Sequence, residues 1–325
     1  MSIQKIAHLA GVSVATVSRV LNNRDSVKPK NRERVLLAIK QSNYQPNLLA
    51  RQLRTAKTRI LLVIVPDIAN HFYADIINGI EDEAGKNDYQ ILLCNTDSHP
   101  ERLKFSLLLL PGKMVDGVIT IDASSTLPGL FKLTGDAPWV QCSELTDTEI
   151  SFCGIDDYQA SRFAVEQFIK RGCRRIAMIN HGLNYKHARC REQGYRDSIN
   201  EISMNYQSIV YTSKISYEEG KKAMTTLLAH NDKPDAIIAT SSILAAGALR
   251  AIQNSGLKVP NDIALIGFDD TDINIMTTPE LSAIQQPSRE IGRQSVKLLL
   301  RKIESPDSKP EKKLLDWNFI QRASS

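Results

Sequence analysis

The sequence predicts two unlike parts: an all-α headpiece of short helices at the N-terminus, followed by an α/β domain built from two lobes. Apolar residues recur at helical spacing through the first 45 residues, and Gly11 interrupts the pattern. From Ile60 onward, short apolar runs alternate with helical segments. The 325 residues, 42% of them hydrophobic and 24% charged, are enough for two or three domains with cores of their own.

Charge is distributed unequally between these two parts. The chain carries a net charge of +5, but residues 1–59 contain twelve Lys and Arg against two acidic residues, Asp25 and Glu33. The rest of the chain therefore carries a net charge of −5. A basic head on a mildly acidic body predicts nucleic-acid binding confined to one end, because phosphate contacts need clustered cations. The alternative is a charged face that only meets solvent.

The cysteines and the apolar segments indicate the compartment. No apolar stretch approaches the roughly 20 residues that a membrane span needs, and the polar N-terminus does not resemble a signal peptide. The five cysteines are scattered and odd in number: Cys94, Cys142, Cys153, Cys173 and Cys190. We therefore expect reduced thiols in a cytoplasmic, nucleoid-associated protein, with no disulfide framework, no metal site and no membrane partner.

The headpiece begins with two helices joined by a tight turn. The apolar residues of segment 3–10 share one helical face, and Gly11 ends that helix. Ser13 is a good N-cap for a second helix that starts at Val14. A third helix, about Lys30 to Ser42, closes the core. This is the helix-turn-helix pattern, in which the second helix enters the major groove of DNA.

The second helix leaves one face available for base edges. Val14 and Ala15 suit apolar contact with thymine methyl groups. Arg19 suits either guanine O6 and N7 or a phosphate. Ser18 and Asn22 are expected on the same outward face.

The headpiece string is more specific than the motif. "IAHLAGVSVATVSRVLNNRDSV", followed by "RERVLLAI" and "NYQPNLLARQL", closely resembles the lac-repressor/gal-repressor (LacI/GalR) family, and the resemblance extends over essentially the whole chain. It implies that DNA is contacted by ten residues: Lys5, Ser13, Val14, Ala15, Thr16, Ser18, Arg19, Asn22, Leu53 and Arg54.

Three positions depart from the family pattern. The family usually has an acidic residue where Lys5 stands, and Ser and Thr where Lys28 and Asn31 stand. Without a Ser cap, the third helix should begin with no side-chain cap, although Pro29 suits a first helical turn. Lys5 and Lys28 also add positive charge to the headpiece.

A short segment after Pro46 is expected to be a hinge. Asn47 can cap a helix of about two turns that ends near Leu53, and so short a helix is marginal in water by itself. The resemblance implies that this hinge orders on DNA and that Leu53 wedges into the minor groove, a known way to bend a duplex. The alternative is an ordinary linker.

The body contains apolar runs typical of parallel strands buried on both faces. These runs are ILLVIV, YQILLC, GVIT, PWVQC, FCGI, RIAMIN, DAIIAT and DIALIGF. The helical segments between them include 73–87, 157–171, 189–201, 217–229 and 242–255. Repeated βα units and the resemblance both imply a two-lobed domain like the type I periplasmic binding proteins.

The expected boundaries follow from this architecture. We predict a headpiece over 1–45, a hinge helix or linker over 46–58, and an effector-binding and dimerisation domain over 59–325. Its N lobe should comprise 59–156 and 288–312, and its C lobe 157–287 and 313–325.

Ligands of such folds gather at the carboxyl ends of strands. Seven residues there are the candidate effector contacts: Phe72, Tyr73, Asp156, Tyr185, His187, Arg191 and Asp269. The resemblance implies recurrent effector contacts at Phe72, Arg191 and Asp269. An Arg and an Asp that face each other across a cleft could bracket vicinal hydroxyls. The alternatives are a core position for Phe72, a surface charge for Arg191 and a local turn cap for Asp269.

The predicted function is a sequence-specific transcriptional repressor controlled by a small molecule. The sequence contains no phosphate-binding loop, dinucleotide fingerprint, hydrolase elbow or HExxH motif, so we expect neither an enzyme nor a bound cofactor. A receptor without a DNA role and an enzyme acting on the same small molecules are the other classes considered.

The partners expected are a near-palindromic double-stranded operator, a second copy of the chain and an effector. We favour a nucleoside such as cytidine, with a sugar (ribose or hexose) or a purine as the alternative. Ser241 and Ser242 stand where the family often has Asn and Asp, which disfavours a hexose.

Overall fold

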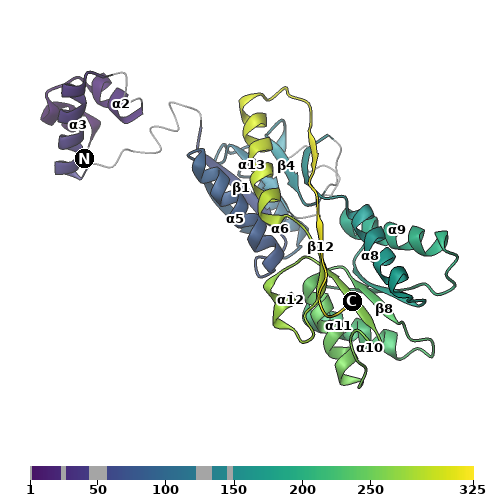
Figure 1. The fold of residues 1–325 in the computed structure, drawn as a ribbon. Coiled ribbons are helices and arrows are strands. Elements are labelled where there is room, and N and C mark those ends of the chain that lie inside the picture. The colour runs from purple at the N-terminus through teal and green to yellow at the C-terminus, as the bar shows by residue number, and fades with distance from the viewer. Residues whose placement is uncertain (1, 23–26, 44–56, 122–133, 145–148) are drawn as a thin grey trace. The chain divides into compact units, whose positions relative to one another are not determined.

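The computed structural model describes residues 2–22, 27–43, 57–121, 134–144 and 149–325 (Figure 1). The chain divides into two compact units, Met1–Thr58 and Arg59–Ser325. We describe each unit by itself. The predicted contacts Leu53 and Arg54 and the core of the predicted hinge lie outside the described residues.

The headpiece unit contains three helices around a small apolar core. They are α1 (Ile3–Ala10), α2 (Val14–Asn22) and α3 (Pro29–Ser42). Gly11 ends α1 in the left-handed conformation, with φ of 60°. The Ser13 Oγ accepts a hydrogen bond from the Thr16 amide at 3.2 Å, so it caps α2 as predicted. Helix α3 begins at Pro29 without a side-chain cap, which confirms the expected effect of Lys28.

The first lobe of the body is built on a six-stranded sheet in the order β11-β5-β4-β3-β1-β2, with every neighbouring pair parallel. Its strands are β1 (Ile60–Val65), β2 (Gln90–Asn95), β3 (Gly117–Thr120), β4 (Trp139–Cys142), β5 (Ser151–Gly154) and β11 (Lys312–Leu314). Its helices are α5 (His71–Lys86), α6 (Pro100–Leu107) and α13 (Ser288–Glu304). We call this part the N lobe.

The second lobe, here the C lobe, repeats this plan in the order β12-β10-β9-β8-β6-β7. Its strands are β6 (Ile176–His181), β7 (Ser208–Thr212), β8 (Ala236–Ala239), β9 (Ala264–Phe268), β10 (Ser282–Gln285) and β12 (Asn318–Ile320), of which β12 alone is antiparallel to its neighbour among the described strands. Its helices are α8 (Asp157–Arg171), α9 (Lys186–Glu201), α10 (Tyr217–Leu228), α11 (Ser242–Asn254) and α12 (Asp272–Met276).

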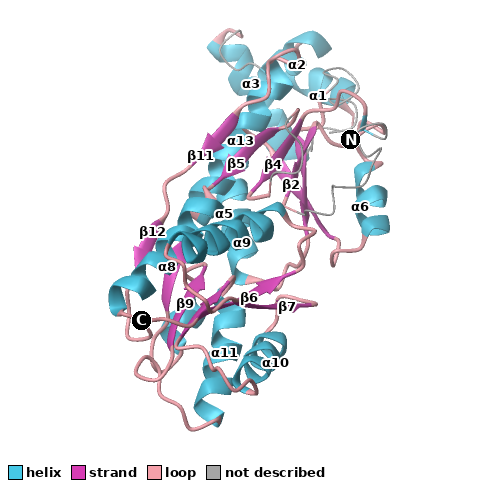
Figure 2. Cartoon of the chain, turned by 90° about the vertical axis from the view of Figure 1, so that its right-hand side faces the viewer, coloured by secondary structure: helices cyan, strands magenta, loops and turns pink. Residues whose placement is uncertain are grey.

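Helices cover both faces of each sheet (Figure 2). In the N lobe α5 packs on α13, and Gly79 and Gly292 allow the contact: a Cβ on Gly79 would lie 2.0 Å from the Arg289 carbonyl oxygen. In the C lobe α8 packs on α9, and α10 packs on α11. This arrangement confirms the predicted fold class, because strands covered on both faces must be apolar on both.

The chain passes between the lobes three times. It does so between β5 and α8, between β10 and α13, and between β11 and β12, where Figure 1 shows a yellow extended segment running along both lobes. Trp317 of the last crossing packs edge-on against Phe163 of α8, with 5.2 Å between ring centroids. Among the described helices, none has the length and apolar character needed to cross a membrane.

Candidate functional site

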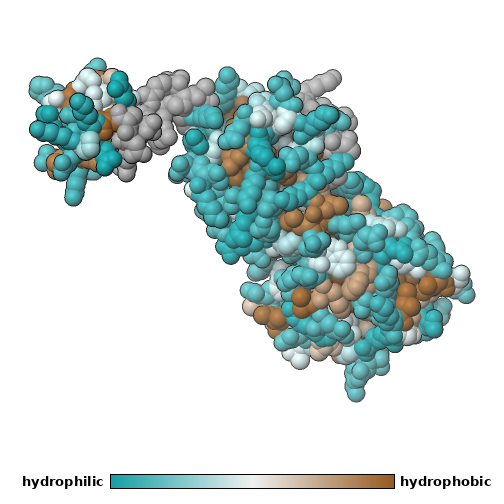
Figure 3. Space-filling view, turned by 45° about the horizontal axis from the view of Figure 1, so that its top comes forward, coloured by the Kyte–Doolittle hydropathy of each residue, from teal (hydrophilic) through white to brown (hydrophobic). Residues whose placement is uncertain are grey.

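The outward face of α2 carries one cation, Arg19, together with the small or apolar residues Val14 and Ala15. Val14 is 42% exposed, and Ala15 and Arg19 are exposed, whereas Val17 and Val20 are buried in the core. Thr16 and Ser18 are half-buried, Lys5 and Ser13 are exposed, and the Asn22 side chain lies outside the described ones. Hydrophilic atoms predominate on the headpiece in the view of Figure 3. The residues predicted to meet base edges therefore point away from the core.

The body has a pocket between its two lobes. The N lobe lines it with Asn70, Phe72, Tyr73, Ile121, Ser143 and Glu144, and the C lobe lines it with His181, His187, Arg191, Ile215, Thr240, Ser241, Asp269 and Gln286. Five of the seven predicted effector residues are in this set. The remaining free space is only about 20 Å³, so the side chains fill most of the pocket.

Arg191 is buried and held by several partners. Its Nε donates to Asp157 Oδ1 at 2.8 Å, and its Nη1 donates to the Thr240 carbonyl at 2.8 Å. The guanidinium carbon lies 4.1 Å from the centre of the Phe268 ring. A surface position for Arg191 is therefore wrong. So is the prediction that Arg191 and Asp269 face each other across the cleft, because both belong to the C lobe.

Asp269 lies at the end of β9 in the left-handed conformation, with φ of 67°. Its Oδ1 accepts a hydrogen bond from Gln286 Nε2 at 2.7 Å. Burial raises the pKa of the Asp269 carboxyl group, and the nearby Arg191 opposes that rise.

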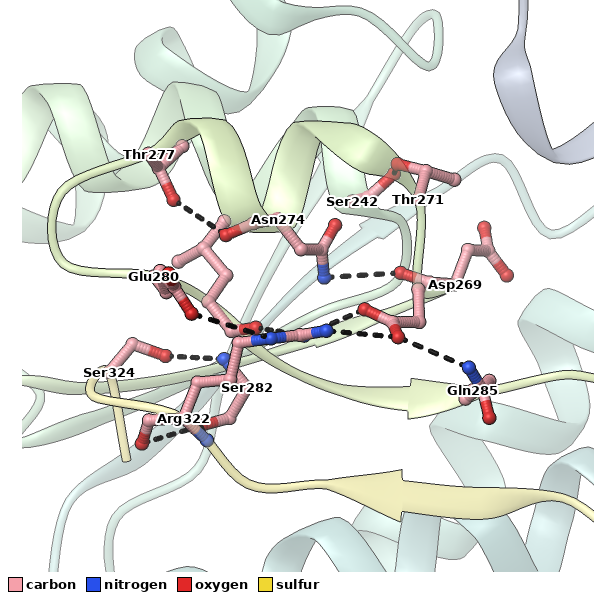
Figure 4. Close-up of polar contacts among 12 residues, drawn as sticks. Ser242, Asp269, Thr271, Asn274, Thr277, Glu280, Ser282, Gln285, Arg322 and Ser324 are labelled. Carbon is pink, nitrogen blue, oxygen red and sulfur yellow. Dashed lines mark hydrogen bonds and ion pairs between the residues drawn. The ribbon is translucent and has the colours of Figure 1, made fainter.

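The turn that carries Asp269 is fixed by the C-terminal segment (Figure 4). Asn274 Nδ2 donates to the Asp269 carbonyl at 3.3 Å. The neighbouring Asp270 carboxylate accepts two hydrogen bonds from Arg322, at 2.7 and 3.0 Å, and one from Gln285 at 3.2 Å. The backbone around Asp269 is therefore held by charge-assisted bonds from outside the pocket.

A chain of hydrogen bonds that the sequence did not reveal crosses the pocket wall. His187 Nδ1 and the amides of Lys186 and His187 contact the Glu144 carboxylate. His187 Nε2 lies 2.9 Å from His181 Nε2, and His181 Nδ1 lies 3.3 Å from Thr240 Oγ1. Burial lowers the pKa of His181 well below its usual range, and His187 and Arg191 lower it further. His181 is therefore neutral at pH 7.

The N lobe contributes aromatic rings instead. Phe72 and Tyr73 of α5 are each 7% exposed, and their ring centroids lie 5.5 Å apart. Both rings line the pocket and also belong to the core of the lobe. The core and ligand-contact interpretations of Phe72 are thus compatible.

Two predicted residues lie elsewhere. Asp156 lines neither this pocket nor the wider cavity beside it; its Oδ1 caps α8 by accepting from the Gln159 amide at 3.0 Å, and its neighbour Asp157 holds Arg191. Tyr185 lines the wider cavity, which has a volume of about 670 Å³ and shares Asn70, Tyr73, His181 and Ile215 with the pocket. Neither cavity is lined by Asp156, and its role as an effector contact stays a prediction.

The two serines at the start of α11, Ser241 and Ser242, make hydrogen bonds within the protein. Ser241 Oγ caps the helix by accepting from the Leu244 amide at 3.3 Å, and Ser242 Oγ lies 3.0 Å from Thr271 Oγ1. No group of three or more His, Cys, Asp or Glu within the described ranges is arranged to hold a metal ion.

Two family descriptions match the chain. "Bacterial regulatory proteins, lacI family" matches residues 2–47, and "Periplasmic binding protein-like domain" matches residues 165–325. The first covers the helix-turn-helix segment and the second covers most of the C lobe with the final crossings.

Full-length relatives agree with these matches. The chain is 35% identical to catabolite control protein A of Priestia megaterium, over 93% of this chain and 92% of that protein. It is 33% identical to the ribose operon repressor of Halalkalibacterium halodurans, over 93% and 90% of the two chains. It is 31% identical to the HTH-type transcriptional repressor PurR of Haemophilus influenzae, over 94% of this chain and 92% of that protein.

Solved structures extend the comparison to the fold. An uncharacterised protein from Actinobacillus succinogenes is 48% identical, with a TM-score of 0.79 over 83% of this chain and all of that one. The lac repressor dimer bound to operator and the anti-inducer ONPF is 26% identical, with a TM-score of 0.89 over 100% and 98% of the two chains. The relatives are named as regulators and repressors, and the chain belongs to the lacI family of bacterial regulatory proteins.

Proposed function

We propose that this effector-responsive repressor binds a near-palindromic operator as a homodimer and that a nucleoside, such as cytidine, is the molecule bound between its lobes. The observation that carries the effector proposal is that one pocket contains aromatic rings from one lobe and an arginine with a carboxylate from the other. The N lobe offers the rings of Phe72 and Tyr73, and the C lobe offers the charged groups of Arg191 and Asp269.

A nucleoside has two parts that match these two sets of residues. Its base can stack on an aromatic ring, and its ribose hydroxyls can bond to a guanidinium and a carboxylate. Sequence segments 61–68, 72–81, 190–199, 218–228 and 265–273 also resemble the cytidine repressor of this family.

A sugar or a purine is the second candidate. The names of two relatives, a ribose operon repressor and a purine repressor, support it. Arg191 and Asp269 could bind ribose without any base, and the aromatic rings could bind a purine base without any ribose, whereas a nucleoside would use both sets of residues.

A thermal-shift screen separates these candidates. Cytidine, uridine, adenosine, ribose, glucose and hypoxanthine are compared at equal concentration. A ligand present at about 100 times its Kd should stabilise the protein by about 2.7 kcal/mol. Stabilisation by ribose or hypoxanthine with none by any nucleoside would establish the second candidate.

The DNA-binding proposal rests on the outward face of α2 and on the excess of cations in the headpiece. Arg19→Ala should weaken operator binding by about 1–3 kcal/mol if Arg19 reads a base. Exchanges at Val14 and Ala15 should change which half-site is preferred in a gel shift and leave the helical content unchanged. Unaltered operator preference after both exchanges would exclude α2 as the recognition helix.

The dimer proposal draws on the similarity to the operator-bound lac repressor dimer. Two headpieces related by a twofold axis would read two half-sites, which is why the operator should be palindromic. Sedimentation should show a dimer on one operator. We further propose residues 46–58 as a hinge, so that Leu53→Ala lowers operator affinity and bending while ligand binding persists.

A further inference from the structure

Glu144 makes an unusual contact for a residue in a loop. It follows β4 in the N lobe, and its side chain is 3% exposed. Its carboxylate accepts from the amides of Lys186 and His187 and contacts His187 Nδ1, all at the start of α9 in the C lobe. One buried carboxylate therefore joins the two lobes.

Glu144 also provides the N-cap of α9. The residue at the N-cap position, Tyr185, makes no side-chain capping bond. The first amides of a helix need an acceptor, and the helix dipole favours a negative charge at that end. Glu144, which lies 42 residues before Lys186 in the sequence, supplies both the acceptor and the negative charge. A side chain of the N lobe thus caps a helix of the C lobe whose own N-cap residue makes no side-chain capping bond.

The contact continues into the pocket. His187 links Glu144 to His181, and His181 reaches Thr240 at the end of β8. The two Nε2 atoms lie 2.9 Å apart, so one must carry a proton and the other must accept it. The tautomer and orientation of each imidazole therefore depend on those of the other. Rotating or withdrawing Glu144 would leave His187 free to turn, and its partner His181 would lose an oriented neighbour.

A second side-chain link between the lobes, among the residues that the structure describes, is weaker. Ser98 Oγ lies 3.0 Å from Tyr185 Oη in an exposed setting. Water can replace a neutral, exposed hydrogen bond at little cost, whereas a buried carboxylate with three donors is expensive to separate. This difference gives a matched control within the same interface.

We propose that Glu144 is a positioning residue that latches the N lobe onto the first turn of α9 and keeps the effector pocket closed before any ligand enters. The proposal builds on the proposed effector site. The pocket has room for about one water molecule, so a nucleoside or sugar can enter only after the lobes part. Glu144 would then set the closed-to-open ratio of the ligand-free protein and, through it, the apparent affinity for the effector.

The test uses the full-length protein without ligand and without DNA. Glu144→Ala, Glu144→Gln and the control Ser98→Ala are compared with the wild type by small-angle scattering and by amide hydrogen exchange. Loss of bonds to a charged group is expected to lower the closed-to-open ratio about tenfold or more in Glu144→Ala. The radius of gyration should rise, and Ser98→Ala should resemble the wild type.

The conservative variant keeps the test informative if Glu144→Ala folds poorly. Gln keeps one carbonyl acceptor for α9 but cannot accept from all three donors as a carboxylate, so its scattering should lie between the wild type and Glu144→Ala. A local structural role predicts faster exchange only at 143, 144 and 186–188. A latch also predicts faster exchange at 71–77, because Phe72 and Tyr73 of this segment line the pocket.

Unchanged scattering together with unchanged exchange at 71–77 in both Glu144 variants would overturn the latch. That result would leave the effector proposal intact, because neither measurement involves a ligand. Conversely, failure of every nucleoside and sugar in the thermal-shift screen would count against the effector proposal and leave the latch supported by its own data.

Discussion

The two lobes of the body share an architecture and differ in chemistry. Each is a six-stranded sheet with helices on both faces, and each packs a helix pair through glycines. At the pocket, the C lobe presents charged groups held in fixed bonds, such as Arg191 on Asp157 and Asp269 on Gln286. The N lobe presents two aromatic rings and Glu144.

The comparison shows that the fold determines where the pocket lies but not which chemical groups each of its walls presents. Arg191 and Asp269, the polar wall, are held by partners of their own lobe, so their bonds do not depend on closure. The aromatic wall and the Glu144 latch act only when the lobes meet. The following experiments test this division, in order of decreasing expected effect.

The polar wall should carry most of the affinity. Asp269→Ala removes a buried carboxylate, and bonds to charged groups contribute about 1.5–3 kcal/mol each, so effector affinity should fall about 100-fold or more. Titration calorimetry with the ligand found by the screen measures this loss, and ligand-free operator binding should be nearly unchanged. Asp272→Ala, an exposed acidic position on α12, is the control. Full effector affinity in Asp269→Ala would show that this carboxylate of the C lobe does not bind the effector.

The helix pairs should respond alike in the two lobes. A Cβ on Gly79 would lie 2.0 Å from the Arg289 carbonyl, and one on Gly247 would lie 2.1 Å from the Tyr217 carbonyl. Gly79→Ala and Gly247→Ala should each lower the free energy of unfolding by about 1–3 kcal/mol, because overpacking forces backbones apart. Gly85→Ala, on α5 with nothing within 4 Å, should be neutral or slightly stabilising. Denaturant unfolding measures all three, and a tolerant Gly247→Ala would show looser packing in the C lobe.

Acid should weaken the C lobe through His181. Its pKa is lowered in the folded protein, so the unfolded state binds the proton more readily, and stability falls as pH drops below the unfolded value of about 6.5. The loss should reach about 1.4 kcal/mol per pH unit at most. Thermal melts of the wild type and His181→Gln between pH 7.5 and 5.5 should diverge in slope.

Asp269 titrates with the opposite sign. Its raised pKa means that stability is lost as pH rises from about 3.8 through the folded pKa. Asp269 is present in both the wild type and His181→Gln, so the difference between their melting curves isolates the histidine. Parallel melting curves for the two proteins would show that His181 does not titrate on unfolding in this range.

The aromatic wall should have the smallest effect and the most selective one. Phe72→Leu keeps an apolar side chain but removes the ring, so affinity for a nucleoside should fall about 2- to 10-fold, and affinity for ribose should not change. Competition titration with both ligands measures the ratio. Equal losses for the two ligands would mean that Phe72 acts through the core of the N lobe and not through a base.

Local patterns in the sequence were sufficient for the headpiece and for most strands. Gly11 ends α1 and Ser13 caps α2 because both act on amides within a few residues of themselves. The run ILLVIV became β1, with five of its six residues buried. By contrast, β7, β10, β11 and β12 were not anticipated. Strands β7, β11 and β12 lie at sheet edges and are half-exposed, so their apolar signal is weak. Strand β10 is mostly buried, but its sequence SAIQ contains only two apolar residues.

The pocket was only partly readable in the sequence. Strand ends pointed to Phe72, Tyr73, His187, Arg191 and Asp269, since carboxyl ends of parallel strands converge. His181 was missed although it is the last residue of β6, at a strand end, and Glu144 was missed because a loop carboxylate carries no pattern. The sequence also predicted helix α9 from residue 189, and the structure begins it at Lys186.

The start of α9 illustrates the difference between what the sequence predicts and what the folded structure adds. The helix-turn-helix and most of the buried strands could be predicted from the sequence, because they depend on residues close together in the chain, and the basic charge of the headpiece follows from its composition. Only the tertiary structure decided where α9 begins, which aspartate holds Arg191 and which histidines meet. The first two depend on partners that are 42 and 34 residues away in the sequence, and His181 also contacts Thr240, 59 residues away. The two histidines meet because their rings turn toward each other. Only the folded lobes bring such groups within hydrogen-bond distance.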